Sequence, residues 1–376
     1  MVHQSGDVWL ANTVPTNFGW GVFWLHSEAN AMQTAKLYYA HLDFAGNVTV
    51  GPMFLLDVPR IDSRDRYYLA AWHDDHFELL IANMSALYSY TMGLDGTLSG
   101  QSIVGPTLFV SDIYSQESDG ELVSYPGGFI AVIEGECQGH SCSYAFKLDP
   151  TGKQNSQNYN LVDFDFTHQF DPRVAFDGLG FVFLSVKDVV ISGGGVTTKY
   201  MTVNGSPGTH LKVVPLKEYL WDEKPDIAWN GDHLGSVWTE NSARLDAAPW
   251  QMHFASFRRT TSSSTLMADK ILEVLPSNIR PLHWTIQILP VGPDWITQYT
   301  RWQNGGDFLA VYDWVNDHGD TMASMTPFVA NASALGSSVH FDSAAAGSIG
   351  ITRGYYDNNG LPNIAFQLMN RPACTP

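Results

Sequence analysis

The stretch that decides the fold is Val174-Ala-Phe-Asp-Gly-Leu-Gly-Phe-Val-Phe-Leu-Ser-Val186. Two short apolar runs flank an Asp-Gly turn, which is the pattern of a tight β-hairpin. Similar hairpin patterns recur along the chain, at 13–24, 69–81, 122–133, 227–238, 299–312 and 354–366. Since helical periodicity is nearly absent between them, the sequence predicts an all-β protein built from repeats.

The hairpin turns are evenly spaced. Their markers are Gly19, Asp75, Gly127, Gly178, Gly231, Gly305 and Gly360, at intervals of 56, 52, 51, 53, 74 and 55 residues. The long interval indicates an insertion near 265–295. A second turn with Gly or Asn follows most hairpins, at 42–47, 94–97, 148–153 and 203–205, where glycine supplies the positive φ. Each module therefore contains four strands, A to D.

Four-stranded modules of this length resemble the blades of the β-propeller superfamily, and the resemblance covers essentially the whole chain. No motif of a particular sub-family is present. We expect one domain over residues 1–376, with modules at about 7–60, 61–110, 111–165, 166–221, 222–290, 291–342 and 343–376. The repeat favours seven four-stranded blades, the last truncated or completed by terminal segments. Six blades with an accessory hairpin is the alternative.

The resemblance implies that strand A lines a central channel. It also implies that the D–A and B–C loops share one face, the upper face, where the loops are long and rich in polar residues. We expect tryptophan, glutamate and histidine side chains of these loops to contact the ligand, namely Trp221, Glu223, His26, Glu134, Glu136, Glu240 and Trp284. Aromatic rings there can stack on sugars. Most other tryptophans, Trp229 among them, are expected to pack between blades.

An aspartate stands just ahead of the predicted strand A in each module. A ring of Asp65, Asp119, Asp171, Asp226 and Asp294 at the channel mouth is a possible site for Ca²⁺ or another divalent ion, which prefers oxygen ligands. The alternative is that each aspartate caps its own turn by hydrogen bonding to the backbone.

One segment carries a mixed set of acid, base and ligand groups. Asp163 and Asp165 are two residues apart, so their side chains share one face of an extended segment, and His168 follows them. The three residues are candidates for a metal-assisted hydrolase, lyase or cyclase, while an acidic solvated loop is the competing interpretation. The cluster Trp72-His-Asp-Asp-His76 is predicted to be a surface turn, because it falls at an A–B position.

Cysteines are few. Cys137 and Cys142 bracket a short polar segment and favour a local disulfide, with a metal site including His140 as the alternative. Cys374 remains, either as a free thiol or as a tether.

The composition excludes several functions. The net charge is −18, from 20 basic and 38 acidic residues, so binding to nucleic acid is not expected. No apolar run is long enough to insert into a membrane. No signal peptide opens the sequence, yet the aromatic-rich, lysine-poor composition is typical of secreted, periplasmic or cell-surface proteins. We therefore expect a ligand-binding propeller for a glycan or other small or surface ligand. An enzyme and a structural propeller in a surface assembly are the alternatives, and the oligomeric state is open.

Overall fold

The computed structural model describes residues 7–27, 34–59, 68–82, 86–105, 120–137, 140–155, 159–160, 168–188, 195–202, 222–241, 250–259, 264–274, 286–302, 308–325, 340–343, 348–356 and 362–370. These residues form twenty-six β-strands in seven antiparallel sheets, and neighbouring strands of each sheet follow one another in the chain. None of the described segments is a helix that is long and apolar enough to cross a membrane.

Five of the sheets have four strands. They are β1 (Asp7–Thr16), β2 (Gly19–Ser27), β3 (Thr34–Leu42) and β4 (Val48–Pro59); β5 (Tyr68–His73), β6 (His76–Ala82), β7 (Leu87–Gly93) and β8 (Leu98–Val104); β9 (Gly120–Tyr125), β10 (Gly128–Cys137), β11 (His140–Leu148) and β12 (Tyr159–Asn160); β16 (Asp222–Trp229), β17 (Leu234–Asn241), β18 (Trp250–Arg259) and β19 (Ser264–Val274); and β20 (Gln287–Val291), β21 (Asp294–Trp302), β22 (Phe308–Val315) and β23 (Thr321–Met325).

The other two sheets have three described strands. They are β13 (His168–Phe176), β14 (Gly180–Asp188) and β15 (Gly195–Thr202), and β24 (His340–Ser343), β25 (Ser348–Tyr356) and β26 (Pro362–Asn370). We refer to the seven sheets as the first to the seventh in chain order.

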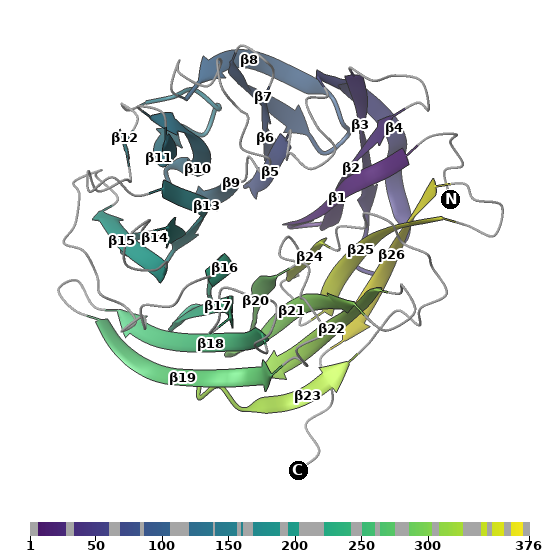
Figure 1. Ribbon diagram of the computed structural model, residues 1–376. Coiled ribbons are helices and arrows are strands. Elements are labelled where there is room, and N and C mark those ends of the chain that lie inside the picture. The colour runs from purple at the N-terminus through teal and green to yellow at the C-terminus, as the bar shows by residue number, and fades with distance from the viewer. Residues whose placement is uncertain are drawn as a thin grey trace.

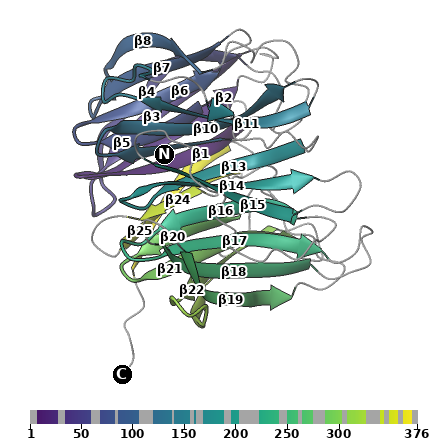
Figure 2. The same ribbon diagram turned by 90° about the vertical axis from the view of Figure 1, so that its left-hand side faces the viewer.

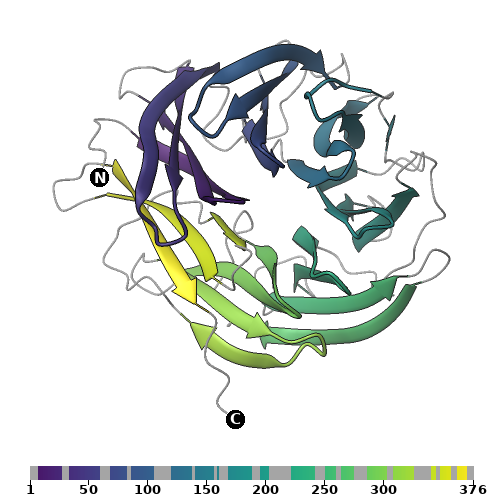
Figure 3. The same ribbon diagram turned by 180° about the vertical axis from the view of Figure 1, so that it is seen from behind.

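The sheets are arranged in a ring, with the first strand of each nearest the centre (Figure 1). Each first strand contacts the first strand of the next sheet, from β1 through β5, β9, β13, β16 and β20 to β24, and β24 and β25 contact β1 again. The view from behind shows the same closed circle (Figure 3), and strands of several sheets run in a similar direction in the side view (Figure 2). The chain is therefore a β-propeller, as the repeat predicted.

The turns explain why the modules fold as they do. The A–B and C–D turns that the sequence predicted are present in the first three sheets, for example between β3 and β4 and between β11 and β12. In the second of these, Asp149 Oδ1 accepts the N–H groups of Thr151 and Lys153 at 2.8 and 3.1 Å, and Gly152 has a φ of 73°. The predicted turn at 203–205 lies outside the described residues.

The predicted strand assignment is wrong by one strand in the last two modules. The pattern at 299–312 forms β21 and β22, and the pattern at 354–366 forms β25 and β26, so both are B–C pairs rather than A–B pairs. The sixth sheet therefore begins at Gln287, before the predicted boundary at 291, and the seventh begins at His340. The apparent insertion near 265–295 arises because the true A–B turn of the sixth sheet is at Gly292.

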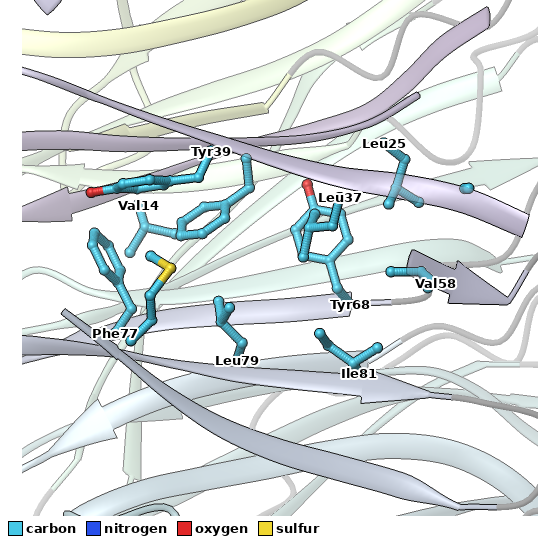
Figure 4. Close-up of a cluster of buried hydrophobic side chains, with 12 residues drawn as sticks. Val14, Leu25, Leu37, Tyr39, Val58, Tyr68, Phe77, Leu79 and Ile81 are labelled. Atoms are coloured by element: carbon cyan, nitrogen blue, oxygen red, sulfur yellow. The ribbon is translucent and has the colours of Figure 1, made fainter. Parts of the chain in front are cut away.

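The hydrophobic core is divided among the contacts between neighbouring sheets. Figure 4 shows the contact of the first and second sheets, where Leu37 and Tyr39 of β3 face Phe77 and Leu79 of β6. All four side chains are buried. Alternate residues of a strand point to opposite faces, so each sheet supplies one apolar set to the sheet before it and another to the sheet after it.

Aromatic side chains pack where the ring closes. Trp20 of β2 is fully buried, and its ring lies 5.4 Å from those of Phe44 and Phe366, the latter on β26. The first sheet therefore packs against the seventh through side chains.

Candidate functional site

A cavity of about 390 Å³ lies among the first strands of six sheets. Its wall is formed by Asn12, Val14 and Pro15 of β1, residues 69–72 of β5, residues 120–124 of β9, residues 173–176 of β13, residues 226–229 of β16 and residues 287–289. A volume in this range accommodates a small ligand. Because the cavity lies at the centre of the ring, it is the described part of the central channel.

Equivalent positions of the first strands supply polar groups to this wall. The ladders between the first and second strands are interrupted just before Asn12, Arg173 and Asp226, and these three residues then pair with Phe23, Leu184 and Val237. An interruption of this kind redirects the side chains of a strand. All three residues line the cavity.

Two carboxylates of the wall hold adjacent sheets together. Glu121 Oε2 accepts the backbone N–H of Val174 at 2.7 Å, and Asp226 Oδ2 accepts that of Ile288 at 2.7 Å. Arg173 Nε lies 3.7 Å from Asp226 Oδ1, and both side chains are nearly buried. These contacts fix the charged groups of the cavity in place.

Three aromatic residues line the cavity near the turns that follow the first strands. They are Trp72 of β5, Phe176 of β13 and Trp229 of β16, and each is half-buried. Trp72 packs edge-on against Phe77 with centroids 4.6 Å apart, and Phe176 lies 5.6 Å from Tyr125. The cavity therefore has aromatic rings toward one end and charged groups farther along the same strands.

The predicted loop position of His26 is wrong. His26 belongs to β2, is 4% exposed and packs edge-on against Tyr38, because the strand continues through Ser27. It therefore lies in the interior of the sheet.

Five other predicted site residues are on strands, and the structure describes only their backbones. His168 begins β13 and pairs with Asp188, Glu223 lies near the start of β16, and Glu240 lies near the end of β17. Glu134 and Glu136 lie on β10 opposite Ser143 and Ser141. The beginnings of β13 and β16 lie at the same axial end of the propeller, so His168 and Glu223 are near that end, on strands rather than in the predicted loops. Trp221, Trp284, Asp163 and Asp165 lie outside the described residues.

The repeat does not place the aspartates at equivalent positions. Asp294 begins the second strand β21, where Trp314 Nε1 donates to it at 3.4 Å, and the equivalent of Asp226 is Arg173 rather than Asp171. The predicted ring is therefore wrong in its geometry, because the first strand of the sixth sheet was misassigned and Asp171 lies two residues before the position of Asp226. In the part of the chain that the structure describes, no three His, Cys, Asp or Glu side chains gather as a metal site. Asp65 and Asp119 lie outside that part.

The predicted surface turn within the cluster at 72–76 consists of Asp74 and Asp75, whereas Trp72 and His73 end β5 and His76 begins β6. Asp74 has a φ of 52° between β5 and β6, His73 Nδ1 lies 2.8 Å from Ser124 Oγ, and His76 Nδ1 lies 2.8 Å from Asp75 Oδ1.

The cysteine pair is defined by its backbone alone. Cys137 of β10 pairs with His140, and Cys142 of β11 pairs with Gly135. The two cysteines thus lie on neighbouring strands near their connection, and the disulfide stays a prediction because the described side chains do not include them.

Most of the cavity wall was not predicted from the sequence. Asn12, Arg173 and Gln287 were not singled out, and Trp229 was expected to serve packing between sheets. The available signal was their place in each strand A, which the resemblance itself assigned to the channel.

Comparison with known proteins gives the fold and no family. No family model matches the chain, and no curated protein sequence matches it. Among solved structures, the chain is similar to the BP39L lectin from Burkholderia pseudomallei, with 10% identity, a TM-score of 0.58 and coverage of 98% of this chain and 97% of the lectin. It is also similar to a subtype N11 neuraminidase-like protein of A/flat-faced bat/Peru/033/2010 (H18N11), with 8% identity, a TM-score of 0.51 and coverage of 99% and 91%. At these identities the likeness shows the propeller fold alone.

Proposed function

We propose that the protein is a carbohydrate-binding β-propeller that takes a neutral saccharide into its central channel. The observation that carries this proposal is the shared cavity of about 390 Å³, which is lined both by Trp72, Phe176 and Trp229 and by Glu121, Arg173 and Asp226. A sugar has an apolar face that stacks on aromatic rings and hydroxyl groups that bond to charged side chains. A lectin is among the structures with this fold, which makes glycans the first probes.

The charge of the wall favours a neutral ligand over an acidic one. Glu121 and Asp226 carry two negative charges, and Arg173 lies beside Asp226. The whole chain carries a net charge of −18. An anionic sugar is therefore repelled on approach. The positive charge of Arg173 that could attract it already lies beside Asp226.

The upper-face residues extend this proposal. Trp221, Glu223, Glu240, Glu134, Glu136 and Trp284 are proposed to contact the part of a longer glycan that projects from the channel. The positions of Glu223 at the start of β16 and Glu240 near the end of β17 support this role.

The test is glycan binding by isothermal titration calorimetry, after a screen of neutral, cationic and acidic oligosaccharides. Trp229→Ala is expected to weaken binding about tenfold, since an aromatic contact is worth about 0.5–1.5 kcal/mol beyond the burial of its area. Phe18→Ala is the control, because Phe18 is 57% exposed and does not line the cavity. If both variants bind as the wild type does, or if no saccharide binds at all, the proposal fails.

An enzymatic function remains the second candidate. His168, Asp163 and Asp165 are its proposed catalytic residues, and Ca²⁺ or another divalent ion is its proposed cofactor. Product analysis on every glycan that binds, together with metal analysis of the purified chain, separates this candidate from simple binding.

We further propose seven blades and a secreted, periplasmic or cell-surface location. The seven sheets in which the first strands contact one another in sequence support this blade count. A fourth strand for the fourth and seventh sheets is part of the same proposal.

A further inference from the structure

A buried carboxyl group lies where the second sheet meets the third. Glu78 of β6 is 0% exposed, and Ser89 of the neighbouring strand β7 is 2% exposed. The turn at 149–153, which connects β11 and β12 of the third sheet, packs over both side chains. A Cβ placed on Gly152 of this turn would lie 2.5 Å from Glu78 Oε1 and from Ser89 Oγ, so the contact is close.

The hydrogen bonds among these groups require a particular number of protons. Ser89 Oγ is hydrogen-bonded to Glu78 Oε1 and lies 2.6 Å from the carbonyl oxygen of Gly152. The carbonyl oxygen can only accept, and the serine hydroxyl has a single proton to donate. Both contacts are therefore satisfied together only when Ser89 donates to Gly152 and Glu78 donates to Ser89, which requires a protonated Glu78.

The ionised carboxylate has a different set of partners. It accepts from Ser89, which then has no proton for the Gly152 carbonyl, and it accepts from Thr91 Oγ1 at 3.3 Å. The donors and acceptors thus allow two hydrogen-bond arrangements, which differ in the oxygen that accepts the Ser89 proton. In only one of them is the turn of the third sheet tied to the second sheet through this hydroxyl.

The surroundings disfavour ionisation. Burial raises the pKa of Glu78 to about 7. The hydrogen bonds from Ser89 and Thr91 lower this pKa, and the negative charge of Asp149 on the facing turn raises it further. On β5 the residue opposite Glu78 is Ala71, and Lys153 on the turn interacts with Asp149. Within the described ranges, no basic side chain forms an ion pair with Glu78.

We propose that Glu78, Ser89 and the Gly152 carbonyl form a proton-operated latch between the second and third sheets. The latch is closed when Glu78 is protonated, because Ser89 then bonds across to the turn. When Glu78 loses its proton to solvent, the carboxylate takes the hydrogen bond of Ser89 and the turn at 149–153 is released. The inference does not depend on the proposed saccharide function.

Hydrogen–deuterium exchange of the full chain tests the latch. We expect the protection of peptides covering 147–155, corrected for intrinsic exchange rates, to fall about tenfold between pH 5.5 and pH 8.5. The equivalent turn of the second sheet, at 93–97, is the internal control. Among the described residues, its Asp95 is hydrogen-bonded to Thr97 of the same turn, so the protection of this turn is expected to stay constant.

Two variants separate Glu78 from its neighbours. Glu78→Gln keeps the shape and always presents an amide N–H to Ser89, so the turn is expected to stay protected at every pH. Asp149→Asn removes the other carboxyl group and is expected to keep a pH response, with its midpoint moved to lower pH because the charge of Asp149 raises the pKa of Glu78. A pH-independent turn in the wild type overturns the latch. So does a Glu78→Gln protein with the wild-type response, or a response that disappears in Asp149→Asn alone.

Discussion

The ion pair between Arg259 and Asp177 allows a sharp test of how the sheets are held together. Arg259 ends β18 of the fifth sheet, and Asp177 lies in the turn between β13 and β14 of the fourth. The guanidinium binds the carboxylate through two nitrogens, with Nη2 2.5 Å from Oδ1. Both side chains are 1% exposed.

The structure gives the size of the effect of Arg259→Ala. The carboxylate keeps the N–H groups of Leu179 and Gly180, both at 2.9 Å, but loses its cation while it stays out of water. Breaking a buried pair from one side costs about 3–5 kcal/mol of the free energy of unfolding. The adjacent Arg258 is the matched control, because its bond to Asp232 at 2.6 Å joins side chains that are 50% and 66% exposed. Arg258→Ala is expected to cost at most about 1 kcal/mol.

Urea denaturation followed by circular dichroism measures both variants. A further protein, with Asp177→Asn and Arg259→Met together, is expected to recover much of the loss, because no charge then remains buried. If Arg259→Ala is as stable as Arg258→Ala, the pair does not stabilise the contact between the fourth and fifth sheets and the reasoning is refuted.

Three more predictions concern other contacts. Gly19→Ala is expected to lower the free energy of unfolding by about 3 kcal/mol or more, because φ is 142° and the new Cβ would lie 1.9 Å from a backbone oxygen. Gly178→Ala is expected to lower it by about 1–2 kcal/mol, because φ is 81° and the space around the new Cβ is open. Equal losses in thermal or chemical denaturation contradict this prediction. Trp20→Ala is expected to cost about 3–5 kcal/mol and to expose the contact of the first and seventh sheets to limited proteolysis, and unchanged digestion contradicts a role in closing the ring. Because the pKa of Glu78 is higher in the folded state, the stability that it contributes is complete below pH 4.5 and is lost as the pH rises to about 7. The free energy of unfolding of the wild type is therefore expected to fall by up to about 3 kcal/mol over that range relative to Glu78→Gln. Parallel pH profiles of the two proteins contradict this prediction.

The candidate site was predicted less well than the fold, and the strands show why. Hairpin turns are local, because an Asp-Gly pair between apolar runs is visible in one short window. The first strand of the sixth sheet, Gln287–Val291, has no such mark, so its neighbours were assigned to the wrong positions. The ladder irregularity falls at the same place in β13 and β16, so Arg173 and Asp226 share one position and Asp171 lies two residues before it.

The sequence by itself determined the repeating β architecture, the positions of most turns in the first three sheets and the acidic net charge. These properties depend on turn chemistry and on alternation within a few residues. Only the tertiary structure decided which side chains meet across the sheets. Glu78 reaches Gly152, Asp177 reaches Arg259 and Glu121 reaches Val174 over separations of 74, 82 and 53 residues, because the ring brings each module against the next. The central cavity is a product of the same closure, since six first strands form its wall and no module contains it alone.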